Sequence, residues 1–351
     1  MIGQIHPYVP TLPTSRLRRF AWWVLAYNLL VIAWGAFVRA TGSGAGCGRH
    51  WPLCNGEIVP RADNVKTIIE ASHRVTSGIA FALVIALAVW TFKGTAKGHR
   101  ARKGAAASTV FIFGEVLLGA GLVLFELVAH DASMKRALSM ILHLGNTFLL
   151  LGALTVTAHA LGRDSSPRDE GEGLARDALV RVAVVCAFAF MLVLGASGAI
   201  AALGDTLFPA RTLGQGLADD ASPVAHAFVR LRVIHPFVAL VTGAFVMGVA
   251  ALVRARIPGR SVQWSGHLVS ALVVVQLAAG LLNLVLLVPV AMQLVHLLLA
   301  DFVWIALVVL REEVRLAQPS KSRNGPAPAS DVPPSTSQVV PVTYEAAGET
   351  R

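Results

Sequence analysis

Long apolar stretches separated by short polar segments make up most of this sequence. About 20 consecutive apolar residues are enough for an α-helix to cross the hydrocarbon core of a bilayer. The pattern predicts eight such helices, over residues 20–40, 66–92, 105–127, 137–160, 179–202, 224–253, 264–288 and 290–311. We therefore expect an all-α integral membrane protein.

An internal repeat divides the predicted helices into two sets. When the sequence is divided at the segment between the fourth and fifth spans, the first four spans align with the last four. The fold is therefore expected to be two pseudosymmetric four-helix bundles. We expect a cytoplasmic N-terminus, an N-terminal half, a cytoplasmic linker, a C-terminal half and a disordered cytoplasmic tail, over residues 1–19, 20–160, 161–178, 179–311 and 312–351.

Composition and charge support a membrane protein and exclude a nucleic-acid partner. Of the 351 residues, 55% are hydrophobic and 14% are charged, and the formal net charge is +10. The basic residues lie between the apolar stretches instead of forming a stripe, which is typical of topology signals and not of phosphate binding. Their distribution places both termini in the cytoplasm, in a multi-pass protein of the plasma or inner membrane.

Four histidines occupy matching positions in the even-numbered spans, all near the outer surface; they are His73, His143, His235 and His296. An ionisable side chain within a span is costly unless it has a partner, so it is a functional candidate. One such histidine could simply form a hydrogen bond between helices. Four in register favour ligands over that alternative.

The pairing of these histidines favours haem over zinc. A zinc site usually adds cysteine or carboxylate ligands, and only Glu70 is near, in one half alone. Haem iron accepts two axial imidazoles, and its apolar macrocycle suits the core of a helix bundle. We therefore predict two haem sites, one with His73 and His143 and one with His235 and His296.

The halves differ three residues before the first histidine of each pair, where Glu70 lies opposite Arg232. A carboxylate beside a haem can exchange protons, whereas an arginine keeps its proton and suits haem propionates. The N-terminal half is thus the predicted reaction centre, and the C-terminal half a fixed redox or structural site. The alternative is an exposed Glu70 that pairs with Arg74 or Lys66.

Other charged residues have weaker interpretations. Candidate propionate partners are Arg39, Arg74, Arg230 and Arg232. Three acidic residues predicted to lie in spans either belong to a proton path or form hydrogen bonds within the bundle; they are Glu115, Glu126 and Asp301.

The first outer loop is rich in glycine and contains Cys47 and Cys54. Oxidising conditions outside the cytoplasm favour a disulfide between them, and two free thiols are the alternative. Such a loop could cover the N-terminal haem pocket. A structural and a redox role for the pair both remain open.

Two segments carry a resemblance to a known family: GSGAGCGRHWPLCNG in the first outer loop and IIEASHR at the start of the second span. They resemble the haem A synthases, and the likeness extends over roughly residues 20–311. It implies an oxidoreductase that oxidises a methyl group of haem O to a formyl group, giving haem A for terminal cytochrome oxidase. It also implies that Glu70 is catalytic, that the N-terminal half binds haem O and that the C-terminal half binds haem b.

The resemblance also implies partners and leaves alternatives. Haem O synthase and cytochrome oxidase assembly factors are the implied partners, beside haem O itself and membrane lipid, and a homo-oligomer is compatible. The second outer loop departs from some bacterial members because it has no cysteine pair. A non-catalytic b-type cytochrome and a haem transporter or chaperone would explain the histidines equally well.

Ligation by two histidines leaves no free position on the iron for O₂. Either one of the two N-terminal ligands dissociates, or electrons leave the substrate haem and water attacks the methyl carbon. The electron acceptor and the source of oxygen are not specified by the sequence.

Overall fold

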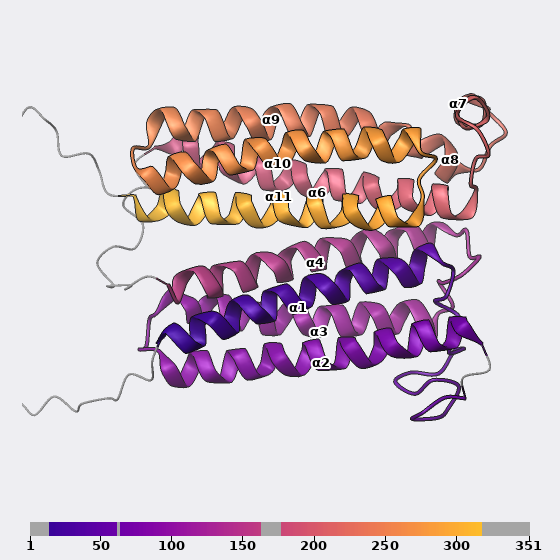
Figure 1. Ribbon diagram of the computed structural model, residues 1–351, viewed down its shortest axis with the longest axis horizontal. Helices are drawn as coiled ribbons and strands as arrows, with labels where there is room; N and C mark the ends of the chain where they lie inside the picture. Colours follow the sequence, from indigo (N-terminus) through magenta and orange to yellow (C-terminus); the bar gives the residue numbers. More distant parts are fainter. Residues whose placement is uncertain (1–13, 62–63, 163–176, 318–351) are drawn as a thin grey trace, which may run out of the picture. The chain divides into compact units, whose positions relative to one another are not determined.

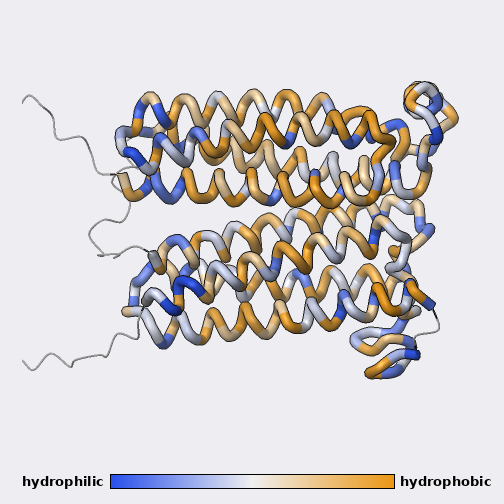
Figure 2. Tube along the Cα trace, in the orientation of Figure 1, coloured by the Kyte–Doolittle hydropathy of each residue, from blue (hydrophilic) through white to orange (hydrophobic). Residues whose placement is uncertain are grey.

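The computed structural model describes residues 14–61, 64–162 and 177–317. Eight helical segments in this part of the chain are long and apolar enough to cross a membrane, so the chain is a multi-pass all-α membrane protein. Figure 2 shows apolar residues along the helices and hydrophilic residues concentrated near their ends. The helices are α1 (Thr14–Ala40), α2 (Val65–Gly94), α3 (Arg100–Leu124), α4 (Met134–Ala160), α6 (Ala178–Leu207), α8 (Ala227–Arg232) continued by α9 (Ile234–Arg256), α10 (Arg260–Val285) and α11 (Val290–Leu316).

All eight expected spans are confirmed, and their ends shift by a few residues. The helix α1 begins at Thr14 and α11 continues to Leu316, so helix extends into both predicted terminal segments. Most of the predicted N-terminus, linker and tail lies outside the described residues, because residues 1–13, 163–176 and 318–351 are not among them.

The helices pack in two groups of four. The first group is α1 to α4, and the second is α6, α9, α10 and α11 (Figure 1). Helices α1 and α4 of the first group contact α11 of the second, and α4 also contacts α6. Helix α1 begins and α11 ends at the same end of the bundle, and the opposite end, here called the loop end, carries the disulfide loop and the short helix α7 (Leu213–Ala221).

A tryptophan fills the space where the two groups meet. Trp304 of α11 is 3% exposed, stacks on Phe148 of α4 and meets Phe188 of α6 edge to face, with both centroid distances 5.0 Å. Gly152 of α4 lies beside its indole nitrogen. Close packing of small against large side chains is what holds helices together in lipid, where apolar burial alone gives little advantage.

The sixth span is interrupted where the sequence places a proline. Pro236 has no N–H to donate to the carbonyl of Arg232, and its ring crowds that carbonyl. The helix accordingly breaks at Val233, between α8 and α9, two residues before His235. The corresponding span of the first group, α2, runs without interruption past His73.

Helices α3 and α10 end in the same way. The N–H groups of Phe125 and Leu286 donate to the carbonyls four residues earlier, and the next residues, Glu126 and Leu287, have φ of 56° and 60°. This left-handed conformation stops both helices. Glu126 therefore lies in a loop and not within a span as expected, and its exposed carboxylate pairs with Arg49 at 3.2 Å.

Candidate haem site

In the second group, His235 of α9 and His296 of α11 approach each other. Their ring centroids are 6.3 Å apart and their planes are nearly perpendicular, at 89°. Two imidazoles on opposite sides of one metal ion, with metal–nitrogen bonds of about 2 Å, would have about this centroid separation. The structure therefore brings this predicted pair together.

Three of the four histidines lie against a glycine of the preceding membrane helix. A methyl group on Gly35 would lie 2.9 Å from Cε1 of His73, and a methyl group on Gly280 would lie 2.9 Å from Cε1 of His296. Gly198 stands in the same relation to His235, at 3.1 Å. Each glycine thus gives an imidazole room to lie close to the helix backbone.

The ring nitrogens also suit a bound metal. The buried Nδ1 atoms of His73, His143 and His296 have no hydrogen-bond partner among the described residues. Nδ1 of His235 is 3.0 Å from the hydroxyl of Ser197, which leaves Nε2 for a ligand. Paired imidazoles, apolar surroundings and glycine-lined clearances fit haem. No ring contact between His73 and His143 is recorded in the part of the chain that the structure describes.

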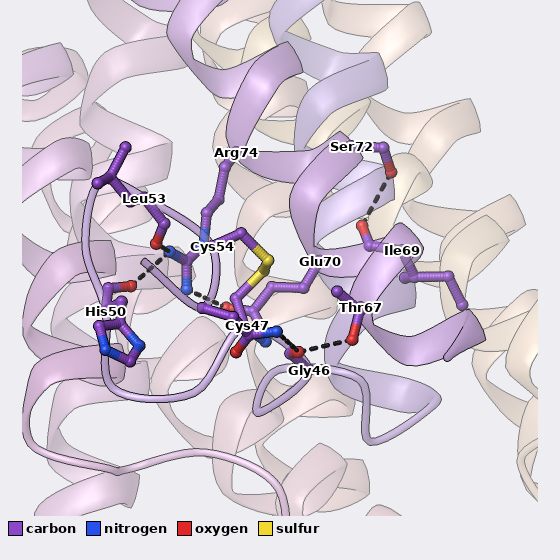
Figure 3. Close-up of a disulfide and its surroundings, with 11 residues drawn as sticks. Gly46, Cys47, His50, Leu53, Cys54, Thr67, Ile69, Glu70, Ser72 and Arg74 are labelled. Carbon is purple, nitrogen blue, oxygen red and sulfur yellow. Dashed lines mark hydrogen bonds and ion pairs between the residues drawn. A yellow bond between two sulfur atoms is a disulfide. The ribbon is translucent and has the colours of Figure 1, made fainter. Parts of the chain in front are cut away.

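Glu70 lies at the start of α2, buried beneath the loop that contains Cys47 and Cys54 (Figure 3). One carboxylate oxygen accepts the N–H of Cys47 at 2.8 Å, and the other pairs with Arg74 at 2.5 Å. Arg74 also donates to the carbonyls of His50 and Leu53, both at 2.6 Å. Glu70 is thus paired with Arg74, as the alternative interpretation held, but it is 3% exposed and not open to solvent.

The disulfide between Cys47 and Cys54 is confirmed, and it closes a loop that rests on the backbone of α2. The hydroxyl of Thr67 donates to the carbonyl of Gly46 at 2.7 Å. A methyl group on Gly46 would lie 2.4 Å from the carbonyl oxygen of Lys66, so only glycine permits this approach. The loop is fixed by its bridge, by this close contact and by the Glu70–Arg74 pair.

Arg232 holds the segment between α6 and α8 in a comparable way. Its Nε donates to Asp220 at 2.7 Å, and its Nη1 donates to Asp205 at 3.2 Å and to the carbonyl of Phe208 at 3.3 Å. This loop has no cysteine, and a guanidinium between two carboxylates connects it to the helices. Asp205 and Asp220 were not predicted, because their contact with Arg232 depends on how α7 folds back over the end of α6.

Two further arginines differ in their surroundings. Arg39, at the end of α1, donates to the carbonyl of Ala202 at 2.9 Å, to Thr206 at 2.7 Å and to Gln293 at 2.9 Å. It therefore connects the first group to α6 and α11 of the second. Arg230 is exposed. A contact between propionates and any of the four predicted arginines stays a prediction.

The embedded acids also have distinct settings. Glu115 of α3 lies beside His143, with 3.4 Å between its Oε2 and the imidazole Nδ1. Asp301 of α11 is completely buried, and neither of its oxygens has a hydrogen-bond partner among the described residues. The contact of Glu115 with a predicted ligand was not foreseen.

Comparison with known proteins identifies the family. The family model COX15-CtaA, described as cytochrome oxidase assembly protein, matches residues 18–308. The chain belongs to this family. The matched residues include part or all of each of the eight spans, and the resemblance seen in the disulfide loop and at the start of the second span is confirmed.

Individual relatives carry two different names. A protein from Thermus thermophilus named protohaem IX farnesyltransferase is 45% identical over 296 residues, which are 84% of this chain and 48% of the relative. Haem A synthases from Alkalihalophilus pseudofirmus and Bacillus licheniformis are 40% and 41% identical over 139 and 143 residues, about two fifths of this chain and 44% of each relative. The chain spans about half the length of the curated relatives it matches.

The glycine contacts lead to a first prediction. Replacing Gly280 with alanine is expected to weaken haem retention roughly 10- to 100-fold, because a crowded core side chain costs about 1–3 kcal/mol and the ring of His296 cannot turn away while it holds iron. Without haem the ring is free to move, so the melting temperature of the haem-free chain should change little. Haem loss to a competing apoprotein, followed by absorbance, measures the effect.

Gly119 provides the matched control. It lies in α3, and a methyl group there would meet nothing within 4 Å. Gly119→Ala should retain haem like the parent chain, and equal haem loss in both variants would contradict a specific role for Gly280.

Proposed function

We propose that this chain is a haem A synthase, which oxidises a methyl group of haem O to the formyl group of haem A for cytochrome oxidase. The observation that carries the proposal is the close approach of His235 and His296 in a member of a cytochrome oxidase assembly family. Haem b would be held by this pair, and haem O would be bound as substrate by His73 and His143. The two halves of the chain, residues 20–160 and 179–311, would then be structural repeats, of which the first binds the substrate and the second holds haem b.

Haem held by two imidazoles supplies an iron that gains and loses electrons. The chain contributes position and proton transfer. Glu70 is buried at the start of α2, one helical turn before His73, where its carboxylate can accept protons released from the methyl group or stabilise positive charge. The disulfide loop bound to Glu70 covers this end of α2 and limits the access of water.

The loop end is proposed to face the extracytoplasmic side, with both termini in the cytoplasm. Basic residues next to the spans are concentrated at the opposite end, as the positive-inside rule requires. An extracytoplasmic position also suits the disulfide between Cys47 and Cys54. The substrate must come from a reaction that attaches an isoprenoid group to haem b, so haem O synthase is the proposed supplier, and cytochrome oxidase assembly factors are the proposed recipients.

Haem extraction from a host without its own haem A synthase tests the activity. The chain is expressed with a haem O supply, and extracted haems are separated by chromatography. Haem A should appear only when the chain is present. Bound haem b and haem O without haem A would instead support a cytochrome or a haem carrier and contradict the proposal.

The names of the Thermus relatives make farnesyl transfer a second outcome to measure. The same extraction detects it if the host also lacks haem O synthase, because conversion of haem b to haem O would then depend on this chain. Haem O formation under those conditions would show that this chain is a farnesyltransferase. The proposal requires that no haem O is formed there.

A further inference from the structure

The two carboxylate oxygens of Glu115 make different contacts. Oε1 accepts hydrogen bonds from the amide of Asn146 at 2.7 Å and from the hydroxyl of Thr147 at 3.0 Å, both one turn beyond His143 on α4. Oε2 lies 3.4 Å from Nδ1 of His143, within ion-pair distance, and this buried Nδ1 makes no hydrogen bond among the described residues. The carboxylate is thus held from one side and faces the imidazole with the other.

The surroundings keep this carboxylate in place. The amide nitrogen of Asn146 also donates to the carbonyl of Phe111 at 2.8 Å. A methyl group on Gly114 would lie 2.5 Å from the amide oxygen of Asn146, so the amide lies directly on α3. These contacts fix Asn146 between the two helices, and Asn146 in turn orients Glu115.

The second group has an amide at the same place. Glu115 precedes the left-handed residue Glu126 at the end of α3 by 11 residues (126 − 115), and Gln276 precedes Leu287 at the end of α10 by 11 (287 − 276). The side-chain nitrogen of Gln276 is 3.4 Å from Nε2 of His296. Two positions that match in the sequence therefore carry a carboxylate, which faces Nδ1 of its histidine, in one group and a neutral amide, which faces Nε2, in the other.

A carboxylate and an amide affect a ligating imidazole differently. A carboxylate that accepts the Nδ1 hydrogen fixes the tautomer, leaves Nε2 for the metal and makes the ring a stronger donor. A stronger, more negative donor stabilises ferric over ferrous iron. An uncharged amide cannot supply this negative charge.

We propose that Glu115 is a positioning residue that orients His143 and lowers the reduction potential of the haem in the N-terminal half below the value it would have with glutamine. The inference rests on the proposed function, since His143 must be an axial ligand. A more easily oxidised haem in the substrate half and a less easily oxidised haem in the other half would direct electrons away from the substrate.

Reciprocal substitutions test the proposal. Glu115→Gln and Gln276→Glu are made in the full chain, expressed with a haem O supply, purified with haem bound in both halves, and titrated potentiometrically with optical detection. Glu115→Gln should raise the potential of the N-terminal haem and leave the other unchanged, while Gln276→Glu should lower the potential of the C-terminal haem. His143→Ala, which removes an N-terminal ligand, assigns the two transitions.

Glu126→Gln is the matched control, because that carboxylate is exposed, at 60% of its side-chain surface, and pairs with Arg49 in a loop. It should leave both potentials unchanged. Unchanged potentials in Glu115→Gln with haem bound would overturn the role of Glu115 and leave the proposed function intact, whereas a parent chain that binds no haem would overturn the proposed function itself. If Glu115→Gln does not fold, Gln276→Glu decides: a C-terminal potential that does not fall contradicts the proposal.

Discussion

Replacing Glu70 with glutamine is expected to lower haem A formation at least about 100-fold, because general acid–base catalysis typically contributes 10²–10⁴ in rate. Glutamine keeps an oxygen that can accept the N–H of Cys47, so the loop retains one of its anchors. It loses the negative charge that faces Arg74 and the capacity to take up a proton. Haem A is quantified by extraction, and bound haem is measured by absorbance in the same preparation.

Two further variants separate catalysis from loop anchoring. Glu57→Gln removes an exposed carboxylate of the same loop and should leave haem A formation unchanged. Replacing Cys47 and Cys54 together with serine loosens the loop while keeping Glu70. If the double serine variant loses as much activity as Glu70→Gln, the carboxylate acts by holding the loop, and full activity in Glu70→Gln would contradict both roles.

The spans were predictable because lipid imposes their length and apolar character on the sequence. The ends were less predictable, since they depend on local hydrogen bonding. The left-handed Glu126 ends α3 before the apolar pattern does, and α11 continues through charged residues to Leu316. The break at Val233 could have been expected from Pro236, whose missing N–H interrupts the helix.

In the candidate site, too, some features could be predicted from the sequence and others could not. The histidines could be chosen from the sequence because buried ionisable groups are expensive and the histidine positions repeat, and Glu70 could be chosen because its position differs between the halves. Arg74 could be named beforehand as a possible partner of Glu70. The contacts of Glu70 with Cys47 and of Arg232 with Asp205 and Asp220 could not, because they depend on how the chain folds over the helix ends. Glu115 was recognisable as an embedded acid, and aligning the third and seventh spans on their ends would have placed it opposite Gln276. Its contact with His143 could not be predicted, because it depends on which faces of α3 and α4 are turned toward each other.

Replacing His235 and His296 together with alanine is expected to remove the haem of the C-terminal half while the N-terminal site keeps its own. Changing a residue that only supports a metal ligand commonly weakens metal binding 10- to 100-fold, so loss of both ligands should cost at least about 100-fold in haem affinity. The two ring centroids are 6.3 Å apart, and alanine at both positions removes both imidazoles from that space. The absorption spectrum and the haem-to-protein ratio of the purified chain measure the loss.

His130→Ala is the control, because this histidine is exposed in the loop between α3 and α4 and has no counterpart in the other half. It should leave the spectrum unchanged. The reciprocal variant, with His73 and His143 both replaced by alanine, should keep the C-terminal haem and lose haem A formation, since the substrate would have no ligand. If the variant without His235 and His296 retains the full haem content, the close pair in the second group is not a haem site, and the division into a substrate half and a haem b half is wrong.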